Sequence, residues 1–186
     1  FKSIDALDDM AAAPGVSMHD YQRVLDQVAD ASLIYLALLL RHGGFRLDPR
    51  HGPRHEAVAV CALRRLNVET ESQEKVLLLV REQRLLAEVS QRRDLDDPFI
   101  LQEVCDAVET ADNLNMLLLL TYLGLQSSEE EGWNERKDFL LWSLYFKVFD
   151  RLMFGDEISE PEYAQVAVIQ QRVLEQLGTE FETDAV

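Results

Sequence analysis

The sequence predicts an all-α protein, a bundle of about seven to eight helices. Apolar residues recur with helical spacing along almost the entire chain and nowhere alternate as a half-buried strand requires. Of the 186 residues, 47% are hydrophobic and only 8 are Gly and 5 are Pro, which is typical of one globular domain with a sizeable core. We therefore expect one helical domain (17–178), preceded by an N-terminal extension (1–16) and followed by a frayed tail (179–186).

The first helices are predicted from capping residues and apolar runs. Ser17 followed by Asp20 resembles a capping box, with Asp in place of the usual Glu, that opens a helix through about residue 29. The next helix, about 31–42, is apolar almost all round, so we expect it in the middle of the bundle. After a loop rich in Gly and Pro, another helix is expected over about 53–66.

Capping signals also divide the second half of the chain. "TESQ" (70–73) reads as a capping box that opens a helix to about Ser90. Asp97 is a natural N-cap, and Pro98 suits the first helical position because its missing N–H has no partner to lose there. Helices are therefore expected over about 98–109, 111–126, 133–154 and 159–177.

The charge of the chain is strongly acidic, with 18 basic and 34 acidic residues and a net charge of −16. Such a surface repels phosphate backbones and anionic lipid headgroups, so we expect neither nucleic acid nor membrane as a partner. The longest apolar run, "LIYLALLL" (33–40), is too short to span a membrane. No secretory signal opens the chain, and its first residue is Phe rather than Met, which suggests a piece of a longer protein.

The two cysteines, Cys61 and Cys105, lie far apart in apolar helical surroundings. Neither belongs to a CxxC pair, which excludes a zinc ribbon or a redox dithiol. We expect two buried thiols and, from this cysteine usage, a cytoplasmic location.

No catalytic motif with a known mechanism is present. The phosphate-binding patterns GxGxxG and GxxxxGK[ST], the nucleophile elbow GxSxG and the zinc motif HExxH are all absent from the sequence. The polar residues that remain as candidates are the four histidines, which all lie in the first third of the chain: His19, His42, His51 and His55.

A hydrolytic metal site needs about three ligands that converge from different helices. His42 ends one predicted helix and His55 begins the next, so the returning loop brings them within reach of each other. His19 opens the preceding helix, at the far end from His42 if the two helices are antiparallel. No Asp stands beside the histidine in "RHGG" or within "MLLLLTYLG", and the nearest carboxylates are Asp48 and Glu56.

Two of the histidines, His42 and His51, also have a purely structural explanation. The helix dipole favours His42 in a last helical turn without any function, and His51 lies in a loop of Gly and Pro that we expect to be exposed. His55 has the strongest case as a ligand, because a cation in the first turn of a helix gains nothing from the dipole.

Six motifs in order resemble the HD domain of the bacterial PII uridylyltransferase/uridylyl-removing enzymes, over about residues 16–178. In that family an apolar helix ends in His-Asp. It is followed, in order, by a Gly-Asp-His turn, a Val-Arg-Glu-His stretch, a Lys-Arg-Asp-Leu-x-Asp-Pro segment, a core helix with Ala-Asp and a Trp-Asn-x-Trp-Lys helix. The corresponding segments here are "LLLRHGG" (38–44), "GPRHEAVA" (52–59), "VREQRLL" (80–86), "QRRDLDDP" (91–98), "LLLLTYLG" (117–124) and "WNERKDFLLWSLY" (133–145).

The resemblance implies an HD-like bundle in which the metal site has been lost. The family's His-Asp doublet falls on Arg41 and His42, or on His42 and Gly43 if the match shifts by one residue. The family's later His and Asp ligands fall on Gln83 and Gly124, and only His19 and His55 match retained histidines. A weak remnant site of His19, His42 and His55 would take Mn, Fe, Mg or Zn if it is functional, but we expect no cofactor.

Three functional hypotheses follow. The first is a catalytically degenerate HD-like domain with a regulatory or scaffolding role in nitrogen signalling, whose partner is another protein or a neighbouring domain of a longer chain. The second is a metal-dependent phosphohydrolase, an uridylyl-removing phosphodiesterase with a residual site. The third is an acidic helical protein-interaction domain, whose partner would bind with strong salt dependence.

Overall fold

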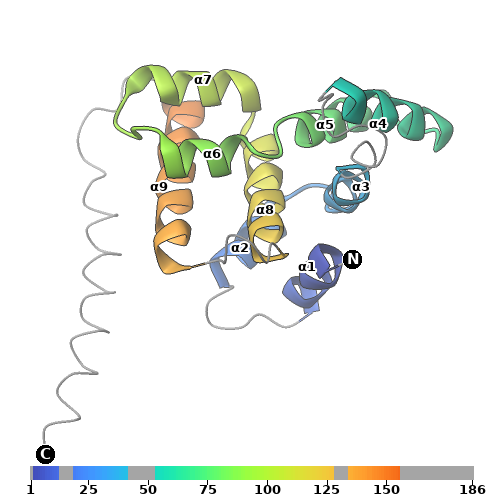
Figure 1. Ribbon diagram of the computed structural model, residues 1–186, viewed down its shortest axis with the longest axis horizontal. Coiled ribbons are helices and arrows are strands. Elements are labelled where there is room, and N and C mark those ends of the chain that lie inside the picture. The colour runs from blue at the N-terminus through green and yellow to red at the C-terminus, as the bar shows by residue number, and fades with distance from the viewer. Residues whose placement is uncertain (1, 13–18, 42–52, 128–133, 156–186) are drawn as a thin grey trace, which may run out of the picture. The chain divides into compact units, whose positions relative to one another are not determined.

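The computed structural model describes residues 2–12, 19–41, 53–127 and 134–155, and Figure 1 shows the helices in these ranges. No strand occurs in them, which confirms the all-α prediction. The helices are α1 (Lys2–Ala12), α2 (His19–Gln27), α3 (Ser32–Leu40), α4 (Pro53–Arg65), α5 (Thr70–Arg81), α6 (Leu85–Arg92), α7 (Pro98–Val108), α8 (Ala111–Ser127) and α9 (Glu135–Phe154).

The chain divides into two compact units, Phe1–Met153 and Phe154–Val186. The first unit holds α1 to α8 and all but the last residue of α9, and the account below concerns this unit. The helix expected over 159–177 and the predicted tail (179–186) lie outside the described residues. None of the helices within the described ranges is both long and apolar enough to cross a membrane.

Helix α8 forms the centre of the first unit, and α1, α2, α3, α5, α6 and α7 all contact it (Figure 1). Every residue from Asn113 to Leu123 is buried, because this helix is apolar on all sides and must be surrounded by others. The sequence analysis expected the helix of residues 31–42 in this place. That expectation was wrong in part, since α3 buries Leu33, Ile34, Ala37 and Leu38 while Leu39 is 54% exposed.

The buried polar side chains of the core make hydrogen bonds, although Asn113 Oδ1 has no partner among the described residues. The Asn113 side-chain amide donates to the carbonyl oxygen of Val108 at 2.9 Å, and the Thr121 hydroxyl donates to that of Leu117 at 2.7 Å. The Tyr145 hydroxyl donates to Asn115 Oδ1 at 2.8 Å and so ties α9 to α8. These bonds matter because a buried polar group without a partner costs about 1–3 kcal/mol.

The helix predicted from residue 70 to Ser90 is interrupted. α5 ends at Arg81 and α6 begins at Leu85, with Glu82 as the C-cap of α5 at φ −93° and ψ 11°. No Gly or Pro marks this break, so helical periodicity continues across it and sequence reasoning missed it. The predicted capping box at 70–73 was also wrong: Glu69 is the N-cap and makes no side-chain capping bond.

The predicted start of α7 is confirmed. Asp97 is the N-cap, its carboxylate accepts a hydrogen bond from the Phe99 backbone N–H at 2.9 Å, and Pro98 begins the helix. The expectation of two buried thiols holds for one cysteine. Cys105 is buried against α9, whereas Cys61 is exposed because α4 buries Ala59 and Leu63 and turns residue 61 outward.

Residues 1–16, expected to form an extension, contain helix α1, which packs on α8. Leu7 is 1% exposed, and the Ser3 hydroxyl donates to the Leu123 carbonyl oxygen at 3.3 Å. The extension therefore contributes to the same core as the helices that follow it. The domain boundaries at 17 and 178 stay predictions, as does the capping role of Ser17, which lies outside the described residues.

Candidate functional site

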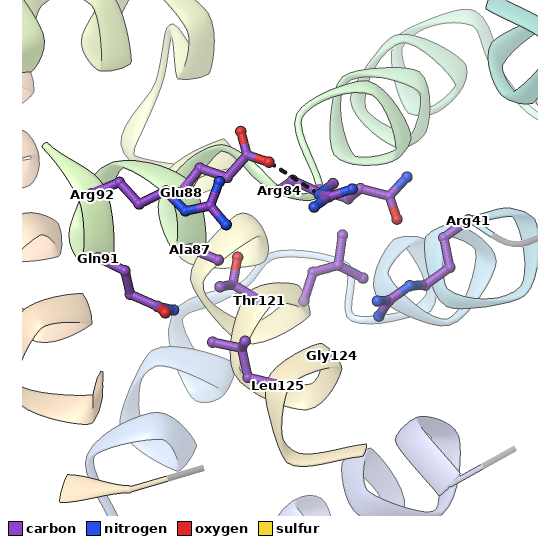
Figure 2. A pocket seen from close by; sticks show the side chains of 11 residues that line it. Arg41, Arg84, Ala87, Glu88, Gln91, Arg92, Thr121, Gly124 and Leu125 are labelled. Carbon is purple, nitrogen blue, oxygen red and sulfur yellow. Dashed lines mark ion pairs between the residues drawn. The ribbon is translucent and has the colours of Figure 1, made fainter. Parts of the chain in front are cut away.

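A pocket of about 270 Å³ lies among the end of α3, helix α6 and the second half of α8. Figure 2 shows Arg41 reaching toward α8 from one side, with Gln91 and Arg92 of α6 on the other. Most of its lining side chains are polar or charged: Arg41, Gln83, Arg84, Glu88, Gln91, Arg92 and Thr121, with Ala87, Leu120, Gly124 and Leu125.

Arg41 is placed in this pocket by the end of its helix. It is the C-cap of α3, and its backbone N–H donates to the Ala37 carbonyl oxygen. Its side-chain Nε and Nη1 are buried and have no hydrogen-bond partner within the described part of the chain. Burial lowers the pKa of the guanidinium from its ordinary value, but arginine remains protonated in proteins. The pocket therefore contains a positive charge that the surrounding side chains do not compensate.

Gly124 makes room for this guanidinium. A Cβ atom at position 124 would lie 2.9 Å from Nη2 and 3.0 Å from Nη1 of Arg41, closer than a side chain tolerates without a shift. α8 thus carries glycine where the arginine of α3 approaches its backbone, and the two residues are matched in shape.

Gln83 lines the pocket from the break between α5 and α6. Its side-chain amide donates to the Val80 carbonyl oxygen at 2.9 Å, which satisfies a carbonyl at the end of α5. Arg41, Gln83 and Gly124 come from three separate elements, and the fold brings all three into the lining of one pocket. These are the three positions to which the resemblance assigns lost metal ligands.

The remaining charges of the pocket belong to α6. Arg84 Nε pairs with Glu88 Oε1 at 3.1 Å, and both side chains are largely exposed (Figure 2). Arg92 is exposed and has no ion pair within the described residues. Three guanidinium groups and one carboxylate give the pocket a net charge of +2, in a chain whose net charge is −16.

Comparison with known proteins connects this chain to one group of enzymes. It is 30% identical to the bifunctional uridylyltransferase/uridylyl-removing enzyme of Methylococcus capsulatus over 133 residues. These aligned residues make up 72% of this chain and 15% of that enzyme. The enzyme with the same name from Caulobacter vibrioides is 28% identical over 148 residues, covering 77% of this chain and 15% of the relative.

The chain is related to a segment of the bifunctional uridylyltransferase/uridylyl-removing enzymes. The relative from Gluconobacter oxydans agrees, at 29% identity over 122 residues, 66% of this chain and 13% of that enzyme. This uridylyltransferase-related chain thus spans about 15% of the length of the curated relatives that it matches. No family model matches the chain, and no solved structure matches it.

The histidines proposed as ligands are distributed between described and undescribed parts of the chain. His19 begins α2 and His55 lies in the first turn of α4, but the structure does not describe their side chains. His42, His51 and Asp48 lie outside the described residues. Glu56 Oε1 lies 3.9 Å from Arg81 Nη1. Within the described residues no group of three or more His, Cys, Asp or Glu side chains is placed to hold a metal ion, and the remnant site stays a prediction.

Sequence reasoning missed the contribution of α6. The pocket-lining residues of this segment are spaced at i, i+3, i+4, i+7 and i+8, which places them on one helical face: Arg84, Ala87, Glu88, Gln91 and Arg92. That spacing was available in the sequence, but it identifies a polar face only. Which neighbouring helix that face approaches depends on the tertiary fold.

A second polar contact in the first unit is structural. The Tyr21 hydroxyl donates to Asp138 Oδ1 at 2.6 Å, which ties α2 to α9. The Tyr21 ring stacks on Tyr122 with centroids 3.8 Å apart and contacts Trp142 at 4.8 Å. Burial raises the pKa of Asp138, although the hydrogen bond from Tyr21 opposes that shift. Burial and the neighbouring carboxylate also raise the pKa of Tyr21, so its hydroxyl stays protonated and remains a donor.

Proposed function

We propose that this chain is a catalytically degenerate, HD-like helical segment of a uridylyltransferase-like protein, with a regulatory or scaffolding role in nitrogen signalling. The observation that carries the proposal is the Arg41 guanidinium, which lies against Gly124 in the pocket that Gln83 also lines. In the family that the chain resembles, the corresponding three positions carry metal ligands. Here they carry a cation, a neutral amide and no side chain.

The electrostatics of Arg41 oppose metal binding at that place. Two unit charges of the same sign 4 Å apart repel by roughly 4 kcal/mol at an effective dielectric constant of 20, and a divalent ion doubles that cost. Arginine cannot relieve the repulsion by losing its proton. A helical segment with a fixed positive charge at the positions to which the resemblance assigns metal ligands would be suited to binding or transmitting a signal rather than to metal-assisted hydrolysis.

The proposed partner is a neighbouring domain of a longer chain, or a separate protein. The relatives support the first choice, because the matched segment is only about 15% of their length. We propose the cytoplasm as the location, as the sequence analysis expected, and neither nucleic acid nor a membrane as a partner.

Metal content and hydrolysis together test the proposal. The purified 186-residue chain is incubated with Mn²⁺ and bis-p-nitrophenyl phosphate, and metal bound after dialysis is measured by mass spectrometry. We expect no turnover above buffer and no stoichiometric Mn, Fe or Zn. Turnover that is abolished by His55→Ala would instead establish the phosphohydrolase hypothesis.

A gain-of-ligand variant tests the assignment of the lost doublet. The double substitution Arg41→His and His42→Asp restores the ligand types of the resemblance and removes the repelling charge, so it should raise Mn²⁺ affinity in calorimetric titrations. Arg64→His, on the exposed end of α4, is the matched control and should leave affinity unchanged. If the double variant binds no more metal than this control, the placement of the doublet at residues 41 and 42 is wrong.

A further inference from the structure

The basic pocket around Arg41 stands out from the rest of the chain by its charge. The protein has about twice as many acidic as basic residues, yet the pocket lining carries three arginines and one glutamate. Glu88 is paired with Arg84 at 3.1 Å, so the charges of Arg41 and Arg92 are left uncompensated by the lining. A concave basic site in an acidic protein selects small anions, because extended polyanions meet the repulsion of the surrounding surface.

Arg41 has buried hydrogen-bond donors in this pocket that lack an acceptor. Its Nε and Nη1 are buried without a partner in the described structure, and buried donors are normally satisfied by protein, water or a bound group. No carboxylate of the described residues lies within ion-pair distance of it. An anion in the pocket would supply the missing counter-charge.

The other polar side chains define where donors remain. The Thr121 hydroxyl donates its one proton to the Leu117 carbonyl oxygen, and one of the two N–H groups of the Gln83 amide donates to the Val80 carbonyl oxygen. The side chains of Gln91 and Arg92 form no hydrogen bond among the described residues, and in Figure 2 both extend from α6 toward the pocket. Donors therefore lie on two sides, with Arg41 on the α3 side and these two residues on the α6 side.

The size and charge of the pocket favour a phosphate group. A volume of about 270 Å³ equals roughly nine water molecules at about 30 Å³ each, which admits a phosphate ion or a small molecule that carries one. A phosphate monoester has about −1.5 to −2 charges at pH 7 and three strong acceptor oxygens, which matches the net +2 of the lining better than a carboxylate does.

We propose that this pocket binds a phosphate group, free or on a small molecule, with Arg41 as its main anchor and Arg92 and Gln91 on the opposite side. The inference deepens the proposed function and rests on it in one respect: a regulatory segment without metal chemistry needs a ligand to which it responds. Arginine at position 41 then has a role of its own, since it converts a site for a cation into a site for an anion.

Titration of the 186-residue chain with inorganic phosphate tests the proposal. Binding is followed by calorimetry and by the NMR signal of the Arg41 Nε–H group, at constant ionic strength set with sodium chloride. We expect saturable binding and a shift of that signal. Arg41→Gln should weaken binding about tenfold or more, the loss expected for a charge-assisted hydrogen bond. The matched control Arg64→Gln, on exposed α4, should bind as the unaltered chain does.

A second variant keeps the test decisive if Arg41→Gln does not fold. Arg92→Gln changes an exposed side chain and should weaken phosphate binding about threefold. Glycerol 3-phosphate, titrated in parallel, distinguishes a free phosphate ligand from a phosphorylated small molecule by which of the two binds more tightly. Equal affinity of Arg41→Gln and Arg64→Gln, or an absence of saturable binding to the unaltered chain, would overturn the proposal.

The two proposals fail in different ways. Manganese-dependent turnover would remove the proposed function but leave phosphate binding to Arg41 measurable in metal-free buffer. Absent phosphate binding together with absent turnover would remove the phosphate site alone.

Discussion

The guanidinium of Arg41 fills the space that a side chain at position 124 would occupy, with Nη2 2.9 Å and Nη1 3.0 Å from the place of a Cβ atom on Gly124. A residue at the end of α3 and a residue in the last turn of α8 are therefore matched to each other. The consequence is a coupling between the two positions that can be measured.

Gly124→Ala should displace the Arg41 side chain and still stabilise the protein slightly. Alanine stabilises a helix interior by about 1 kcal/mol relative to glycine, and the group in its way is the far end of a flexible side chain. We expect the free energy of unfolding to rise by less than about 1 kcal/mol, with a changed NMR signal of Arg41 Nε–H. In an Arg41→Ala background the same substitution should gain the full amount. Identical gains in both backgrounds would show that the two residues are not coupled.

Arg41→Met should stabilise the protein in phosphate-free buffer. The substitution replaces a guanidinium with buried, unpaired nitrogens by an apolar side chain of similar length, and the replacement of poorly compensated buried charges is often neutral or stabilising. We expect the free energy of unfolding in urea to rise by about 1 kcal/mol. The control Arg64→Met, at an exposed position, should change it by less than about 0.5 kcal/mol. A clear loss of stability in Arg41→Met would mean that the charge has a partner.

Tyr21→Phe should destabilise the protein more than Tyr35→Phe does. Both hydroxyls donate to a carboxylate, Tyr21 to Asp138 at 2.6 Å in a partly buried site and Tyr35 to Asp8 at 2.5 Å in an exposed one. Phenylalanine retains the ring contacts but leaves Asp138 without its donor, which costs about 1.5–3 kcal/mol for a hydrogen bond to a charged group. Water replaces the donor at Asp8. Equal losses in urea unfolding would contradict this assignment of burial.

Asp138→Asn should change how stability depends on pH. Burial raises the folded-state pKa of Asp138, so the native state binds a proton more tightly than the unfolded chain does. The contribution of this group is fully present below its unfolded pKa and is lost as pH rises through the folded pKa. The Asn variant has no such loss and should gain stability relative to the unaltered protein as the pH rises above the ordinary carboxyl pKa of about 4. Glu103→Gln, at an exposed site on α7, should show no comparable trend in urea titrations.

The two cysteines should differ in their reaction with Ellman's reagent. Cys61 is exposed on α4, while Cys105 is 7% exposed beneath α9. We expect one equivalent of thiol to react promptly in the native protein and a second only after unfolding in guanidinium. Cys61→Ser should abolish the prompt reaction. A prompt reaction that survives in this variant would show that Cys105 is accessible.

Much of the helical organisation was predictable because its causes are local. Asp97 and Pro98 specify the start of α7 through a side-chain cap and a fixed backbone angle, and neither depends on distant residues. The break between α5 and α6 was not predictable in this way. Its carbonyl at Val80 is satisfied by the Gln83 side chain, and no Gly or Pro announces it.

The site was predictable only in part. The order of six motifs, and their resemblance to those of the HD-domain family, singled out Arg41, Gln83 and Gly124. The fold places these three residues in the lining of one pocket. The polar face of α6 was missed, because helical spacing shows which residues share a face but not what that face approaches. The exposure of Cys61 was missed for a related reason, since an apolar neighbourhood in sequence does not establish which side of α4 is covered.

Local sequence alone determined that this protein is helical, where α7 begins and that no familiar phosphate-loop or nucleophile motif is present. The tertiary structure decided which helix lies at the centre, which thiol faces outward and how closely Arg41 approaches Gly124. The physical reason is that capping and periodicity act within a few residues along the chain, whereas burial and charge compensation arise from side chains that only packing brings together.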